Sequence, residues 1–154
     1  MSARILHSVV AAARCVLLAA LGVSTLKLAW VFFMSEFPVD SWRAFFAAVA
    51  ALPIGIGIHS ILSLAYFGVP VFIGCSLYSY VGAYRPRFWH PTRWVPASFA
   101  MALIATLTGQ AAYGASWGHF SGWDAGNELV SSLSIGVGLS TGAFAILRAR
   151  IGPV

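Results

Sequence analysis

The sequence predicts an all-α protein, a polytopic integral membrane bundle of five transmembrane helices. Charged residues make up 8% of the 154 residues and apolar residues 60%, whereas roughly 25% of an ordinary soluble domain is charged. A soluble domain of this length keeps about a third of its unfolded surface in contact with water, and so few charged side chains cannot cover it. Residues 44–84 contain no Asp, Glu, Lys or Arg and would extend about 60 Å as a helix, about twice the thickness of a hydrocarbon core.

The five predicted spans form a single domain over residues 1–154. They cover residues 15–34, 44–67, 69–84, 97–117 and 129–147. The first span contains one charged residue, Lys27, and continues past it without the small residues of a signal-peptide cleavage site, so we expect it to be retained. Gly68 and Pro70 divide the long apolar run into the second and third spans, because both residue types favour a break between helices.

The sequence also allows four crossings with a re-entrant segment within residues 69–84, because this stretch is short for a spanning helix. Lys and Arg are enriched on the cytoplasmic side of membrane proteins. Four crossings place seven arginines on one side and one on the other, whereas five crossings place six against two. Charge therefore favours four spans, and the length of the apolar run favours five. Both topologies place the C-terminus in the cytoplasm.

The net charge of +5 comes from arginines that stand singly or in threes beside apolar runs. This pattern is typical of proteins oriented in a membrane, where arginines meet anionic headgroups. We therefore expect the lipid bilayer as a partner and no nucleic acid. The basic charge is almost entirely arginine in an Ala-rich chain, which indicates a GC-rich bacterial genome. The expected localisation is the bacterial inner membrane, with the C-terminus cytoplasmic.

Glycines spaced four residues apart indicate close helix packing. Gly114 and Gly118 make one such pair, and Gly138 and Gly142 make another. Glycines at this spacing lie on one helix face and let two backbones approach closely in lipid. The grooves that they form would pack the last two helices together within one subunit, or would serve as an oligomer interface.

Three polar residues lie within predicted spans: Lys27, His59 and Gln110. A charge in hydrocarbon costs roughly 2.5–3.5 kcal/mol, and such residues usually face a bundle interior or a wet cavity. No acidic residue within a span can pair with Lys27, so its counter-charge would be Glu36 or Asp40, a carbonyl group or a partner chain. No second histidine lies at the depth of His59, so we expect a hydrogen bond to a carbonyl or a serine rather than haem ligation.

No catalytic, cofactor or metal site is predicted. The histidines lack the spacing of zinc ligands, and Cys15 and Cys75 stand alone within apolar runs. All four carboxylates lie in loops, where they do not form a positioned acid–base pair. The chain has no hydrolase, metalloprotease, P-loop or dinucleotide-binding motif.

The loop of residues 85–96 is a candidate contact for lipid headgroups or for a partner. It carries Arg85, Arg87 and Arg93 together with two tryptophans. Arginine binds phosphate with two parallel hydrogen bonds, and tryptophan favours the membrane interface. The same composition is also typical of an ordinary cytoplasmic loop.

These observations predict a small inner-membrane protein that is not an enzyme. It would act as a non-catalytic subunit or accessory protein through helix–helix packing, with itself as a homo-oligomer or with a larger membrane complex. The alternative is a component of an oligomeric transporter or channel for an ion or small solute, with Lys27, His59 and Gln110 along its path.

Overall fold

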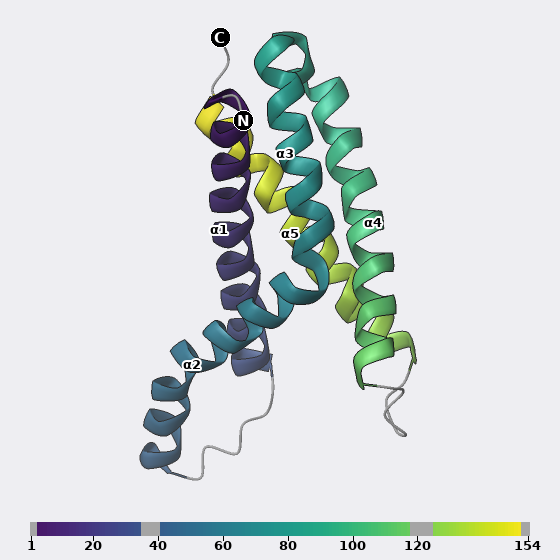
Figure 1. Cartoon of the computed structure of the whole chain (residues 1–154). Coiled ribbons are helices and arrows are strands. Elements are labelled where there is room, and N and C mark those ends of the chain that lie inside the picture. Colours follow the sequence, from purple (N-terminus) through teal and green to yellow (C-terminus); the bar gives the residue numbers. More distant parts are fainter. Residues whose placement is uncertain (1–2, 35–40, 118–124, 152–154) are drawn as a thin grey trace.

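The computed structural model describes residues 3–34, 41–117 and 125–151, and these are helical apart from Ser41, Arg85 and His90. The chain forms five α-helices, a π-helical turn η1 and a short 3-10 helix η2 (Figure 1). In chain order they are α1 (Ala3–Met34), α2 (Trp42–Ser63), η1 (Leu64–Gly68), α3 (Val69–Tyr84), η2 (Pro86–Trp89), α4 (Pro91–Trp117) and α5 (Ala125–Ile151).

The helices run up and down between two ends of the bundle. The start of α1, the end of α5 and η2 lie at one end, which we call the η2 end (Figure 1). The opposite end holds the end of α1, the start of α2, the end of α4 and the start of α5 (Figure 1). Four helical runs in the described residues are long and apolar enough to cross a membrane: Ile5–Phe32, Trp42–Ala83, Pro91–Tyr113 and Val130–Arg150.

The predicted count of five spans is not confirmed, because α2, η1 and α3 form one continuous helical run. Gly68 and Pro70 were expected to end a helix, and instead the chain stays helical through both. Proline has no N–H, and its ring crowds the carbonyl four residues earlier, here that of Tyr66. The wider π-turn over Leu64–Gly68 accommodates that ring without a break in the helix. The third predicted span, α3, continues to the η2 end and does not turn back as a re-entrant segment would (Figure 1).

Three helices extend beyond the predicted apolar spans. Helix α1 begins at Ala3, α4 begins at Pro91, and α5 covers Ala125–Ile151. Hydropathy predicts which part of a helix lies in hydrocarbon. It does not predict the helical turns that extend beyond the membrane. Pro91 fits the start of α4, because the first helical position needs no N–H partner and favours the fixed φ of proline.

Small side chains fill the centre of the bundle. Helix α5 packs most extensively against α4 and α1. The buried core of these two partners and α5 includes Ala12, Cys15, Ala19, Ala20, Ala102, Ala105, Leu139, Ala143 and Phe144. Lipid tails are as apolar as these side chains, so the hydrophobic effect does not drive the helices together as it does in a soluble core. Close van der Waals packing between helices has to stabilise the bundle instead.

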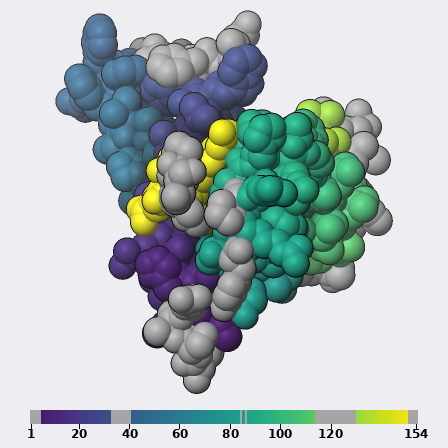
Figure 2. All heavy atoms as spheres, turned by 90° about the horizontal axis from the view of Figure 1, so that it is seen from above, coloured from purple at the N-terminus to yellow at the C-terminus, as the bar shows by residue number. Residues whose placement is uncertain are grey.

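Helix α2 leaves this bundle. It slants away from α3 and α4 below the π-turn (Figure 1), and seen along the bundle it stands apart from them (Figure 2). Only 6% of the most apolar part of Trp42–Ala83 is buried, against 28–39% for the other three runs. The molecule therefore consists of a packed bundle and a projecting helix that the rest of the chain barely covers.

Replacement of Gly136 by alanine should destabilise the bundle by about 1–3 kcal/mol, because it overpacks a close helix contact. A Cβ atom there would lie 3.1 Å from the Thr106 backbone nitrogen and 3.2 Å from the Ala102 carbonyl oxygen, and neither atom can move aside. The matched control is Gly22→Ala in α1, whose Cβ would meet nothing within 4 Å. Reversible unfolding in detergent should show the loss for Gly136→Ala alone, and equal stability of the two variants would contradict this packing.

Candidate functional site

A group of polar side chains joins α1, α2 and α5 inside the structure. The His59 Nδ1 atom lies 2.9 Å from Ser24 Oγ and 3.2 Å from Ser63 Oγ. The Lys27 ammonium donates a hydrogen bond to Ser131 Oγ at 2.6 Å. We call these five residues the polar cluster.

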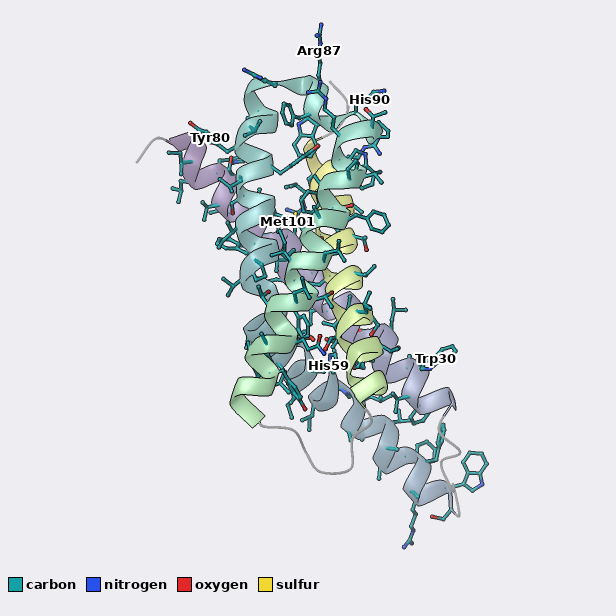
Figure 3. The ribbon with its side chains drawn as sticks, turned by 90° about the vertical axis from the view of Figure 1, so that its right-hand side faces the viewer. Trp30, His59, Tyr80, Arg87, His90 and Met101 are labelled. Carbon is teal, nitrogen blue, oxygen red and sulfur yellow. The ribbon has the colours of Figure 1, made fainter. Side chains whose placement is uncertain are left out.

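Helical spacing brings the members of the polar cluster together. Ser24 and Lys27 are three residues apart on α1, and His59 and Ser63 are four apart on α2, so each pair shares one helix face. Ser24 is 0% exposed and Ser63 is 2% exposed. His59 lies between helices in the half of the molecule away from Arg87 (Figure 3).

The geometry around His59 suits a link between helices. A histidine beside a serine hydroxyl is also the pairing of a nucleophile with its base. Here both hydroxyls that face His59 are buried, and one of them belongs to the neighbouring helix α1. The hydrogen bond from α1 to α2 instead fixes the C-terminal end of α2 against the bundle, directly before the π-turn.

Lys27 joins α1 to α5 near one end of the bundle. It lies five residues before the end of the run Ile5–Phe32, a rise of about 8 Å along the helix. The ammonium group of its long side chain therefore lies near the membrane boundary, where burying a charge costs less free energy than at the midplane. None of the side chains that the structure describes is a carboxylate, and the proposed counter-charges Glu36 and Asp40 lie outside the described residues.

The structure brings together two of the three predicted intramembrane polar residues. Lys27 lies near enough to His59 for its charge to act on the imidazole. Gln110 is half-buried in α4, and it makes no hydrogen bond to any residue of the polar cluster. The expected serine partner of His59 is confirmed. The individual residues Ser24, Ser63 and Ser131 were not predicted, although Ser24 and Ser63 lie three and four residues from Lys27 and His59 on the same helix faces.

The two glycines of α5 face α1 within the same chain. A Cβ atom on Gly138 would lie 2.9 Å from Val23, and one on Gly142 would lie 3.3 Å from Ala19. Helix α1 therefore packs against Gly138 and Gly142, whereas α4 packs against Gly136. The surroundings of Gly114, which belongs to α4, and the whole of Gly118 lie outside the described residues.

The three predicted arginines of the η2 end are exposed, and Arg87 extends away from the bundle (Figure 3). The loop that carries them folds back on α3. The Tyr78 hydroxyl donates a hydrogen bond to the Phe88 carbonyl, and the Trp89 ring lies edge-on to the Tyr78 ring with centroids 5.3 Å apart. The arginines are therefore attached to a fixed aromatic platform.

Histidine and cysteine do not assemble elsewhere within the described parts of the chain. No group of three or more His, Cys, Asp or Glu side chains there is arranged to hold a metal ion. Cys15 and Cys75 are buried as free thiols. His90 is exposed at the η2 end, where its Nδ1 atom lies 2.9 Å from Thr92 Oγ1.

The hydrogen bond between α1 and α2 should contribute a measurable part of the stability. Replacement of His59 by leucine removes the partner of Ser24, and such bonds in membranes are worth about 0.6 kcal/mol on average and about 1.7 at most. Unfolding in detergent should show a loss in this range for His59→Leu and none for His90→Leu, which removes a histidine from the surface. Ser24→Ala should cost less in the His59→Leu background than in the wild type. Additive losses would show that the two side chains do not act on each other.

No protein-family model, curated protein or solved structure matches this chain. The polar cluster, the projecting α2 and the arginines of the η2 end are therefore the features from which its function is inferred.

Proposed function

We propose that the protein is a non-catalytic subunit of a membrane complex, and that α2 is the helix that contacts the partner. The exposure of α2 is the observation that carries this proposal. Its large apolar side chains include several that are each more than half exposed: Trp42, Phe46, Ile54, Ile58 and Ile61. The partner is a second copy of this chain or a larger membrane protein.

The length of the run that contains α2 supports the proposal. It has 42 residues, whereas the other three runs have 21–28. As a helix it is about 63 Å long, about twice the roughly 30 Å of a hydrocarbon core. A bilayer fitted to the three shorter runs cannot enclose the long one upright, so α2 has to tilt away from the bundle. The tilt separates α2 from α3 and α4 but leaves it in contact with α1, and the side of α2 away from α1 is accessible to another helix.

One face of α2 has the small residues that allow a close approach. Ala50, Pro53 and Gly57 follow at intervals of three and four, and we call them the small-residue face. A Cβ atom on Gly57 would meet nothing within 4 Å, whereas one on Gly55 would lie 3.4 Å from Leu28 of α1. The side of Gly55 is thus covered by the chain itself, and the side of Gly57 is open to a partner helix.

We further propose four crossings in a bacterial inner membrane, with both termini in the cytoplasm. Four runs suit a membrane by length and composition, and α1 begins at the end of the bundle where α5 finishes. Seven of the eight arginines belong to the sequence near the η2 end, and Arg43 stands at the start of α2. The enrichment of arginine on the cytoplasmic side of membrane proteins supports this orientation.

Association through α2 should be lost when the small-residue face is blocked. We expect Gly57→Leu to abolish co-purification of the partner from mild detergent, because the added side chain holds the two helices apart. Gly22→Leu is the matched control, since Gly22 on α1 also has nothing within 4 Å of a Cβ atom and lies away from α2. Co-expression of tagged and untagged copies identifies a homo-oligomer, and tagged protein alone identifies other partners. A wild-type protein that purifies only as a monomer would contradict the proposal.

The orientation predicts which engineered cysteines an impermeant thiol reagent reaches in intact cells. With Cys15 and Cys75 replaced by alanine, Ser41→Cys at the start of α2 should be labelled from outside. Arg87→Cys at the η2 end should be protected until the cells are lysed. Protection of both positions would indicate five crossings, and the reverse pattern would indicate the opposite orientation.

A further inference from the structure

We propose that the η2 end is a binding site for the headgroup phosphate of an anionic phospholipid, with Arg93 and Arg148 as the principal contacts. The inference depends on the chain being embedded in a membrane with this end in the anionic leaflet. It does not depend on which partner contacts α2.

Two guanidinium groups at this end lie over aromatic rings. The Arg93 Cζ atom lies 5.1 Å from the centroid of Phe88, and the Arg148 Cζ atom lies 5.0 Å from the centroid of Trp94. Cation–π attraction holds an arginine over an aromatic ring, and the guanidinium still offers the fork of N–H donors that matches two phosphate oxygens. Both side chains are exposed, so the fork is accessible to a ligand.

The ring under Arg93 belongs to a group of aromatic rings that joins several helices: the Phe88 ring lies 6.2 Å from the Tyr78 ring, measured between centroids. Tyr78 of α3 lies 5.3 Å from Trp89 of η2 and 5.3 Å from Phe144 of α5, measured between ring centroids. The Trp94 ring of α4 lies under the guanidinium of Arg148 of α5. A headgroup therefore meets arginines whose positions are set by the bundle, and less conformational freedom is lost when it binds.

The side chains that the structure describes around these rings carry no negative charge. No carboxylate side chain lies in the described part of the chain, and the sequence has its four carboxylates at residues 36, 40, 124 and 128. Residue 128 is the fourth residue of α5, which begins at the opposite end of the bundle, and the other three positions lie outside the described residues. Further exposed arginines add to the positive potential of the η2 end: Arg14, Arg85, Arg87 and Arg150.

The surface below the arginines suits a lipid better than a free anion. Ala100, Ile104 and Leu107 lie seven, eleven and fourteen residues after Arg93, on the same face of α4, and all three are exposed. An acyl chain along this face would lie on apolar side chains while its phosphate reached the guanidinium groups. Juxtamembrane arginines and tryptophans recognise anionic headgroups at the cytoplasmic surface in this way.

The test is the binding of phosphatidylglycerol to the purified full-length protein in detergent, measured by native mass spectrometry, with phosphatidylcholine as the neutral reference lipid. Wild-type protein should retain phosphatidylglycerol in preference. Arg93→Gln and Arg148→Gln should each weaken its retention about fivefold, as expected for one arginine near an anionic surface. Arg43→Gln removes the same charge from the opposite end and should leave retention unchanged. Equal retention of the two lipids by the wild type would overturn the proposal.

Two further measurements separate this site from general charge attraction. Arg93→Lys and Arg148→Lys keep the charge but lose the planar fork, so retention should fall in both; lysine variants that bind like the wild type would overturn the assignment of these residues. Inorganic phosphate should compete poorly, and displacement of the lipid by millimolar phosphate would assign the site to a free anion instead. Unfolding curves check that each variant is folded. The association assay with Gly57→Leu is independent, so failure of either proposal is recognised separately.

Discussion

Backbone groups in hydrocarbon have no water to bind, and this constraint determines the course of the chain through residues 42–84. A break at Gly68 and Pro70 would leave N–H and C=O groups without partners, which costs several kcal/mol for each group. The chain instead widens into a π-turn and continues as a helix. The number of membrane-length runs, the shared end of α1 and α5, and the tilt of α2 all follow from this continuity.

The polar cluster attaches one end of α2, and the rest of α2 projects from that attachment. His59 and Ser63 lie immediately before the π-turn, where α2 still touches α1. Their hydrogen bonds hold that end of α2 in place, and the glycines of α5 hold α1 from the other side. The remainder of α2 contacts the chain through apolar side chains of α1, such as Leu28 opposite Gly55 and Phe32 beside Phe45. The molecule thus presents an exposed apolar helix from a fixed base, an arrangement suited to assembly with another membrane protein.

The class of fold was predictable because composition alone excludes a soluble surface, and Lys27 and His59 were identifiable because ionisable residues are rare in apolar runs. A serine was one of the partners expected for His59, but the particular serines were not identified, because serine is common in membrane helices and its pairing depends on helix rotation. Gly68 and Pro70 misled the sequence analysis, since helix-breaking tendencies measured in water weaken where the backbone has no other partner. The groove of Gly138 and Gly142 was visible in the spacing, but its occupant α1 depends on the order in which the helices pack.

The π-turn also determines the rotational phase of α2 relative to the bundle. A π-turn holds one residue more than the α-turn it replaces, and each residue advances an α-helix by about 100°. The faces of α2 and α3 are therefore offset, and the direction of the small-residue face depends on chain length within residues 64–68. Insertion or deletion of a single residue there would rotate Gly57 about the helix axis without altering any side chain of α2. A change in partner geometry can thus arise from a length change far from the contact itself.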